Sequence, residues 1–319
     1  MSRFPDGPPP ASSRPTSVDQ LIDGRLMARL DHLDVMSRKI FNGRVQGERR
    51  SKRRGQSVEF ADFRPYVAGD DLRFVDWNIF GRLDRLFLKI FLEEEDLSLM
   101  VAIDASASMH WGDPSKFEFV RRLAMALGYI GLVNQNRVSL AAFGGLDESG
   151  APAGLQRISN LRGRRRTHEA GKWLLGLEPG GKGGFTDAMK SLALSRQGRG
   201  VMIVISDFLH KDGFETGLRY VAGRGYDVFA MQVLAPQEID PRSHGMSGDL
   251  RLVDLEDEDE AEVTVNGAVL RGYKDRLDTW CGRLRDFCIR RSIMHMIVDS
   301  GMDLDTLMLD YLRRRGLLR

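Results

Sequence analysis

Short apolar segments alternate with longer amphipathic ones from residue 97 onward, and this alternation constrains the fold most strongly. Segments 97–103, 201–205 and 228–234 are apolar at almost every position, as strands buried on both faces are. The stretches between them carry apolar residues at helical spacing. Parallel strands need crossover connections, which are usually helices. The order therefore predicts an α/β domain over residues 95–319 with a doubly wound, mostly parallel sheet.

The first 94 residues follow a different pattern. Residues 1–17 are rich in Pro and Ser with little to bury, which is typical of a disordered tail. Residues 18–41 repeat apolar side chains at helical spacing and predict one amphipathic helix. The run 44–54 holds six basic residues and one acid, so we expect it to be exposed. Residues 18–94 are thus expected to form an N-terminal segment of helix, basic run and sequence signature.

The cysteine content and the hydropathy of the chain indicate the cellular compartment in which we expect the protein. The two cysteines argue against a disulfide-framed secreted domain, and the first residues lack the apolar core of a signal peptide. The longest apolar run has 11 residues, against about 20 for a helix that crosses a bilayer. The formal net charge of +2 gives no global field toward nucleic acid or membrane. We therefore expect a cytoplasmic protein without a membrane span.

Polar side chains follow two of the apolar strand segments and a glycine-rich connection between them. In open parallel sheets, ligands bind outside the carboxyl ends of the strands. Hydroxyl and carboxylate oxygens with few charges suit Mg²⁺ or Mn²⁺ that retains several waters. We therefore predict a divalent metal site, with one position left for a carboxylate from outside. Its predicted ligands, direct or through water, are Asp104, Ser106, Ser108, Thr186 and Asp207.

These residues resemble the metal-ion-dependent adhesion site of von Willebrand factor A domains. The pattern of that site is Asp-x-Ser-x-Ser, then a distant Thr and a distant Asp, and each element occurs here in order. The resemblance implies a von Willebrand A-like fold and a Mg²⁺-dependent, non-catalytic role in binding proteins. The alternative is that the serine-rich loop only caps the following helix.

A second resemblance lies upstream of the predicted domain. Segments 53–60 (RRGQSVEF), 64–66 (RPY), 69–73 (GDDLR) and 75–77 (VDW) resemble the signature of the bacterial domain of unknown function 58 family. In that family the signature stands immediately before a von Willebrand A-like domain. The resemblance implies a partnership with a MoxR-type AAA+ ATPase, or with its client, in the assembly or maturation of a client complex.

The signature segment admits two compatible interpretations. In the first interpretation, ion pairs around Tyr66 and Trp77 fix a loop. In the second interpretation, the same residues form a docking surface for a partner. Trp, Tyr and Arg are enriched in interface hot spots, which favours the second. His110, which follows the serines, is a candidate at the rim of the metal site. The candidate partner-binding residues are Arg64, Tyr66, Asp70, Asp71, Arg73, Asp76, Trp77 and His110.

The sequence matches two enzyme classes in part and departs from each at an essential residue. Segment 176–182 fits most of a phosphate-binding loop, but Gly183 stands where that loop needs Ser or Thr to hold Mg²⁺. An aspartyl phosphatase could use Asp104 as its nucleophile, but Ser106 stands where a second carboxylate would act as general acid. We therefore expect no enzymatic activity.

Nucleic-acid binding is the remaining alternative. The basic runs 49–54 and 162–166 could neutralise several phosphates, and such binding would weaken steeply with salt. No aromatic residues that could stack on bases are interleaved with either run. Nucleic acid is therefore the less favoured partner.

Overall fold

The computed structural model describes residues 14–35, 59–92, 97–195, 200–253, 255 and 260–319. The chain divides into two compact units, one of residues 1–42 with 97–319 and one of residues 43–96. The segment expected over 18–94 is thus shared between the units, and its helical part belongs to the larger one. Among the described helices, none combines the length and the apolar character that crossing a membrane requires.

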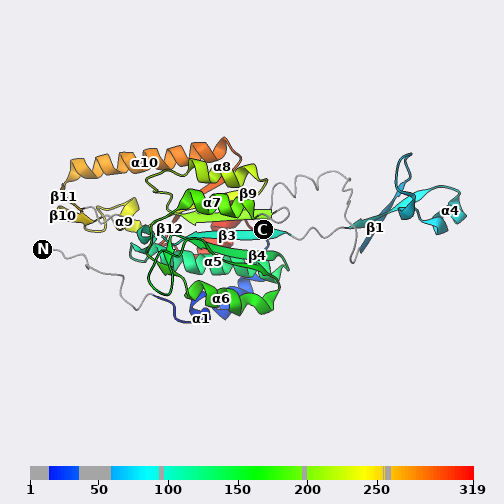
Figure 1. Cartoon of the computed structure of the whole chain (residues 1–319), viewed down its shortest axis with the longest axis horizontal. Coiled ribbons are helices and arrows are strands. Elements are labelled where there is room, and N and C mark those ends of the chain that lie inside the picture. The colour runs from blue at the N-terminus through cyan, green and yellow to red at the C-terminus, as the bar shows by residue number, and fades with distance from the viewer. Residues whose placement is uncertain (1–13, 36–58, 93–96, 196–199, 254, 256–259) are drawn as a thin grey trace. The chain divides into compact units, whose positions relative to one another are not determined.

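A six-stranded sheet forms the middle of the larger unit (Figure 1). Its strands are β3 (Ser98–Asp104), β4 (Arg137–Phe143), β6 (Gln156–Leu161), β8 (Gly200–Ser206), β9 (Asp227–Leu234) and β12 (Met294–Asp299). The order is β12-β9-β8-β3-β4-β6, with parallel pairing from β12 to β4 and antiparallel pairing at the edge strand β6. This sheet confirms the predicted α/β class.

The chain changes direction across the sheet at β3. From β3 it runs outward through β4 to β6, and then returns to β8 on the other side of β3 before continuing to β9 and β12. The carboxyl ends of β3 and β8 therefore flank the switch point, which is where open α/β sheets bind their ligands. Asp104 ends β3 and Asp207 directly follows β8.

Helices cover both faces of the sheet (Figure 1). Alternate residues of β3 face two different cores, with Leu99, Val101 and Ile103 in one and Met100 and Ala102 in the other. The first core includes α5 and α6, and the second includes α7, α8 and α10. The bounds are α5 (Lys116–Val133), α6 (Thr167–Leu175), α7 (Phe185–Leu194), α8 (Glu215–Gly223) and α10 (Gly267–Ile289).

Short elements complete the larger unit. Two small antiparallel pairs lie outside the main sheet, β5 (Gly145–Leu146) with β7 (Glu178–Pro179) and β10 (Gly248–Val253) with β11 (Glu260–Val265). The single-turn elements are η3 (Ala107–His110), η4 (Arg164–Arg166) and α9 (Pro236–Ile239). The C-terminal elements are α11 (Leu304–Thr306), the π-helical turn η5 (Leu307–Tyr311) and α12 (Leu312–Arg314).

The N-terminal helix differs from the prediction. Residues 18–30 form two short helices, α1 (Val18–Leu21) and α2 (Gly24–Leu30), so the expected single helix over 18–41 is wrong in its described part. Ile22 is extended, and the carboxylate of Asp23 accepts the N–H of Leu26 at 2.6 Å as the cap of α2. The apolar spacing continues across the break because both helices bury side chains in the same core. Residues 36–41, the tail up to residue 13 and the basic run 44–54 lie outside the described residues.

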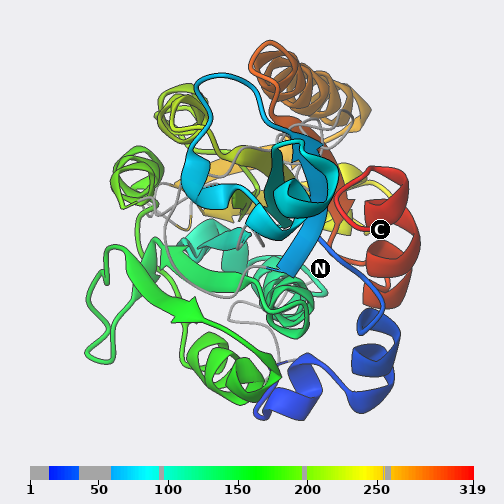
Figure 2. The ribbon, with the colours of Figure 1, turned by 90° about the vertical axis from the view of Figure 1, so that its right-hand side faces the viewer.

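The N-terminal helices lie beside the C-terminal ones (Figure 2). Arg29 forms an ion pair with Asp305. Asp34 and Arg319 exchange two backbone hydrogen bonds, at 3.2 and 3.1 Å. Segments almost three hundred residues apart are therefore joined within one unit.

The smaller unit contains an antiparallel pair, β1 (Glu59–Pro65) with β2 (Phe87–Leu92). The turn η2 (Leu72–Phe74) and the helix α4 (Trp77–Leu83) lie between these strands in the chain. Asp76 caps α4, because its carboxylate accepts the N–H groups of Asn78 and Ile79 at 2.9 and 3.2 Å.

Candidate functional site

Asp104 is the centre of the polar cluster at the switch point. Its side chain has no exposed surface, and its Oδ1 accepts the N–H of Ser106 at 2.9 Å. The hydroxyl of Ser206, the last residue of β8, donates to Oδ2 at 2.6 Å. Burial raises the pKa of Asp104, and the nearby charge of Asp207 raises it further. The structure therefore joins the ends of β3 and β8 through this carboxylate.

Two serine hydroxyls lie next to each other in the loop that follows Asp104, and the first of these serines contacts the Asp104 carboxylate. Ser106 Oγ and Ser108 Oγ are 3.1 Å apart. Adjacent ligands of an octahedral Mg²⁺, each at about 2.1 Å, lie about 3 Å from one another. The hydroxyl pair thus fits two neighbouring positions around such an ion, and all the donors are oxygens of the kind that Mg²⁺ prefers.

The glycine-rich connection lies directly against the serine loop. Gly144 has φ +75°, and a Cβ there would lie 3.1 Å from the Ser106 nitrogen and 3.2 Å from the Gly183 Cα. The N–H of Ala107 donates to the carbonyl of Gly181 at 3.1 Å. Glycine at position 144 therefore permits the close approach of the segment after β4 to the serine loop and to the glycine-rich connection.

Thr186 is the second residue of α7, which the glycine-rich connection leads into, and its side chain is half-buried. The preceding residue, Phe185, stacks on the ring of His210 with centroids 4.8 Å apart. These contacts place the start of α7 beside the loop that follows β8. The role of Thr186 as a metal ligand stays a prediction.

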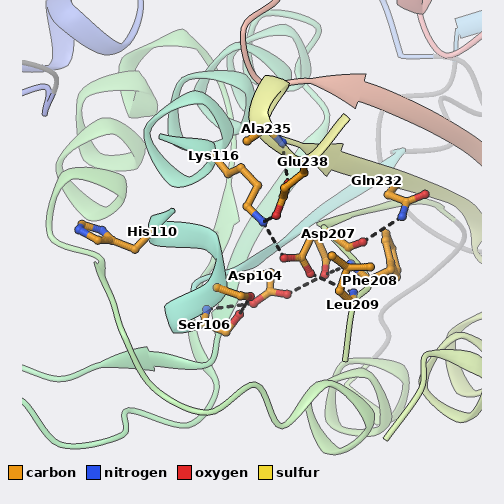
Figure 3. A network of polar contacts seen from close by, with 12 residues as sticks. Asp104, Ser106, His110, Lys116, Asp207, Phe208, Leu209, Gln232, Ala235 and Glu238 are labelled. Atoms are coloured by element: carbon orange, nitrogen blue, oxygen red, sulfur yellow. Dashed lines mark hydrogen bonds and ion pairs between the residues drawn. The ribbon is translucent and has the colours of Figure 1, made fainter. Parts of the chain in front are cut away.

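A buried lysine holds Asp207, the last of the predicted ligands. Lys116 Nζ lies 2.9 Å from Asp207 Oδ2 and 2.7 Å from Glu238 Oε1, and the lysine side chain is 1% exposed (Figure 3). Asp207 Oδ1 accepts the N–H of Leu209 at 3.0 Å. Glu238 in turn accepts the N–H of Ala235 at 2.7 Å.

The charge states of this triad follow from opposing effects. Burial alone would lower the pKa of Lys116, but Asp207 and Glu238 outweigh it and raise that pKa, so the ammonium stays charged. Burial would raise the pKa of Asp207, but Lys116 and the Leu209 N–H lower it overall. For Glu238, burial prevails and raises the pKa. The structure thus presents an ionised Asp207 with its counter-charge already in contact.

The sequence analysis missed Lys116 and Glu238. The helix α5 begins at Lys116, with Ser115 as its N-cap, so Lys116 lies in the first turn. A cation in the first turn of a helix is disfavoured by the helix dipole. A lysine at this position, followed by mostly apolar helical residues, was therefore the signal in the sequence that Lys116 has a buried anionic partner. Glu238 follows the end of β9, a third carboxyl end at the same edge of the sheet.

His210 also belongs to the site and was missed. Its Nε2 lies 3.3 Å from Ser206 Oγ and 3.4 Å from Asp104 Oδ2, and its side chain is 8% exposed. Its position four residues after Ser206, in the loop that follows a buried strand, was the available signal.

His110, the predicted rim residue, points away from the cluster around Asp104 (Figure 3). Burial lowers its pKa, and the charge of Arg14 lowers it further. Its Nδ1 is a buried atom without a hydrogen-bond partner among the described residues. The role of His110 toward a partner stays a prediction.

The candidate partner-binding residues of the smaller unit are engaged with one another. Arg64 forms an ion pair with Asp70 at 2.7 Å, and Arg73 forms one with Asp71. Trp77 is 60% exposed and packs edge-on against Phe80 at 6.1 Å. Ion pairing fits the structural interpretation, and the exposed indole fits docking. The backbone N–H of Tyr66 donates to the carbonyl of Leu86 at 2.9 Å.

The second basic run, 162–166, is tied to the larger unit. Arg164 pairs with Asp31 at 3.2 Å and lies over the ring of Tyr129. Arg166 pairs with Glu169. These ion pairs compete with phosphate for the same guanidinium groups, so they do not favour nucleic-acid binding.

Comparison with known proteins identifies the family. The model of the family described as "Protein of unknown function DUF58" matches residues 62–278. The chain belongs to the DUF58 family. That match covers the smaller unit from Asp62 onward, the switch point and the first half of α10.

Relatives and solved structures similar to this DUF58 chain include the uncharacterized proteins Rv1480 of Mycobacterium tuberculosis and Mb1516 of Mycobacterium bovis. Each is 26% identical over 238 residues, which cover 72% of this chain and 73% of the relative. An aerotolerance-related membrane protein from Bacteroides fragilis is 16% identical, with a TM-score of 0.39, over 69% of this chain and 98% of that one. A von Willebrand factor type A structure from Catenulispora acidiphila is 12% identical, with a TM-score of 0.36, over 72% and 43%. Because both TM-scores are below 0.5, the fold class rests on the strand order given above.

Proposed function

We propose that this protein is a non-catalytic, Mg²⁺-dependent protein-binding module. The observation that carries the proposal is the pair of hydroxyls of Ser106 and Ser108, 3.1 Å apart in the loop where Ser106 binds the buried carboxylate of Asp104. This group lies at the switch point of a parallel sheet, where such folds bind ligands. Asp104, Ser106, Ser108, Thr186 and Asp207 would hold Mg²⁺ or Mn²⁺ directly or through water.

The charge balance of the cluster supports a divalent ion. Three carboxylates, of Asp104, Asp207 and Glu238, share one ammonium group, that of Lys116. Buried charges are costly unless they are paired. A bound dication would balance the two remaining negative charges when all three carboxylates are ionised.

The metal would supply a Lewis-acid position that accepts a carboxylate from another protein. An Asp or Glu of the partner would complete the coordination, so chelation of the ion would abolish that contact. We propose a MoxR-type AAA+ ATPase, or its client, as the partner, within the cytoplasm and in assembly or maturation of a client complex. The partner rests on the family's resemblance, and the metal on the geometry of the site.

The proposal is tested by binding of the purified chain to a purified MoxR-type ATPase, measured by biolayer interferometry. With Mg²⁺ present we expect saturable binding that chelator abolishes and Asp104→Ala weakens at least tenfold. The matched control is Asp212→Ala, an exposed carboxylate five residues after Asp207, which should bind like wild type.

The outcomes separate the metal from the partner. Equal binding with chelator and with Asp104→Ala would remove the metal site from the interaction. Absence of binding under every condition would remove the ATPase as the partner, and its client would be tested in the same way.

A further inference from the structure

Lys116 occupies an unusual position for a lysine. It is the first residue of α5, and its side chain is buried between two carboxylates at 2.9 and 2.7 Å. Both the loss of solvent and the positive end of the helix dipole disfavour an ammonium group there. Asp207 and Glu238 must therefore supply the interaction that retains it.

Asp207 has no oxygen left without a donor in this arrangement. Oδ2 faces the Lys116 ammonium, and Oδ1 accepts the N–H of Leu209 at 3.0 Å. Asp104 differs, because the groups around it are neutral donors, the N–H of Ser106 and the hydroxyl of Ser206, with His210 at 3.4 Å. Of the two predicted carboxylate ligands, only Asp207 is paired with a permanent cation.

We propose that Lys116 sets the metal affinity of this site by acting as a resident counter-cation for Asp207. The lysine compensates Asp207 before any ion arrives, and its charge also repels a dication nearby. The chain alone then binds Mg²⁺ or Mn²⁺ weakly, and a partner's carboxylate adds a further ligand and a further negative charge that tighten the binding. Metal and partner thereby bind cooperatively. This inference rests on the proposed function.

Glu238 provides the opposing control within the same triad. It shares the Lys116 ammonium with Asp207, and α9 holds it through the Ala235 N–H. Removal of its charge leaves the ammonium to Asp207 alone and takes one negative charge from the cluster. Both changes lower the attraction for a dication, whereas removal of the lysine raises it. A purely structural role for the triad predicts no such opposite effects.

The test is a titration of the full chain with Mn²⁺ alone, with free Mn²⁺ followed by electron paramagnetic resonance. Lys116→Met should bind Mn²⁺ at least tenfold more tightly than wild type, because it frees Asp207 and removes a nearby positive charge. Glu238→Gln should bind several-fold more weakly. Lys116→Met combined with Glu238→Gln should bind at least tenfold more tightly than Glu238→Gln.

Lys116→Met leaves two buried carboxylates, of Asp207 and Glu238, without their cation, and this variant could fail to fold. The double variant leaves only Asp207 in that state, so it keeps the test decisive. Arg121→Met is the matched control, since Arg121 is a second buried cation of α5, 1% exposed, that pairs with Glu118 instead. It should bind Mn²⁺ as wild type does.

The results distinguish this inference from the proposed function. Mn²⁺ binding that requires Asp104 but is unchanged by removal of Lys116 would overturn the role of the lysine and leave the metal site intact. Failure of wild type and all variants to bind Mn²⁺ would overturn both. If Arg121→Met increased the Mn²⁺ affinity as much as Lys116→Met does, the increase would reflect the loss of any nearby positive charge. That result would overturn the specific role of Lys116.

Discussion

Burial and the charged groups in contact together decide the charge of single residues inside this protein. Lys116 remains charged because two carboxylates contact it, whereas His295 of β12 stays neutral because no anion does so among its described contacts. Burial, together with the smaller effects of the charges of Arg285 and Arg315, lowers the pKa of His295 to about 4. Its Nε2 lies 3.2 Å from Gln232 Oε1.

His295 makes the stability of the fold depend on pH. Its folded pKa of about 4 is below the unfolded value of about 6.5, so the unfolded chain binds more protons between these values. The contribution is complete above about pH 6.5 and is lost as the pH falls toward about 4. We expect wild type to lose about 1–3 kcal/mol more than His295→Gln between about pH 7.5 and about pH 5, measured by urea unfolding.

The exposed His244 is the control for this experiment. His244→Gln should retain the pH dependence of wild type. A wild type and a His295→Gln variant with the same pH dependence would show that His295 titrates alike in the folded and unfolded chains.

At the scale of elements, α5 determines how closely a helix approaches the sheet. Gly131 of α5 faces β3 and β4, and a Cβ there would lie 2.7 Å from Val138 Cγ2 and 2.8 Å from Leu99 Cδ2. Gly128, one turn earlier, would place a Cβ at 3.6 Å from Leu140, an ordinary contact. One glycine is thus required by packing and the other is not.

The two glycines predict opposite effects of the same substitution. Gly131→Ala should destabilise the fold by about 1–3 kcal/mol, because overpacking outweighs the better helix propensity of alanine. Gly128→Ala should stabilise it by about 0.5–1 kcal/mol, because the propensity gain meets no clash. Urea unfolding of both variants measures the difference, and equal effects would contradict the close approach of α5 to the sheet.

At the scale of the whole molecule, the core of the larger unit is assembled without the smaller one. Its two hydrophobic clusters draw on residues from 21–35 and from 99–318. The helices α1 and α2 contribute Leu21, Leu26 and Leu30, which are at most 4% exposed. The N-terminal helices are therefore integral to this unit.

This division predicts the result of removing the smaller unit. A chain in which a Gly/Ser linker of equal length replaces residues 43–96 should unfold in one cooperative transition and bind Mn²⁺ as wild type does. Circular dichroism and the Mn²⁺ titration measure both properties. A collapsed or aggregated product would show that folding of the larger unit needs residues 43–96. Loss of ATPase binding alone would assign the docking surface to the smaller unit, with its exposed Trp77.

The apolar patterns predicted the strands and helices of the sheet domain with good accuracy, because burial on one or both faces leaves a local periodic record. The same patterns failed over residues 18–41, where two short helices share one apolar stripe. The break depends on Asp23, whose role as a cap is a short-range hydrogen bond that apolar spacing does not reveal.

The sequence by itself determined the fold class and the position of Asp104 and Asp207 at the carboxyl ends of buried strands, since both are properties of contiguous segments. Only the tertiary structure decided that β3 and β8 are neighbours, that Ser206 binds Asp104 and that Lys116 compensates Asp207. These contacts join residues about a hundred positions apart. Strand order and helix placement choose such partners, and a local pattern of hydrophobicity carries no information about them.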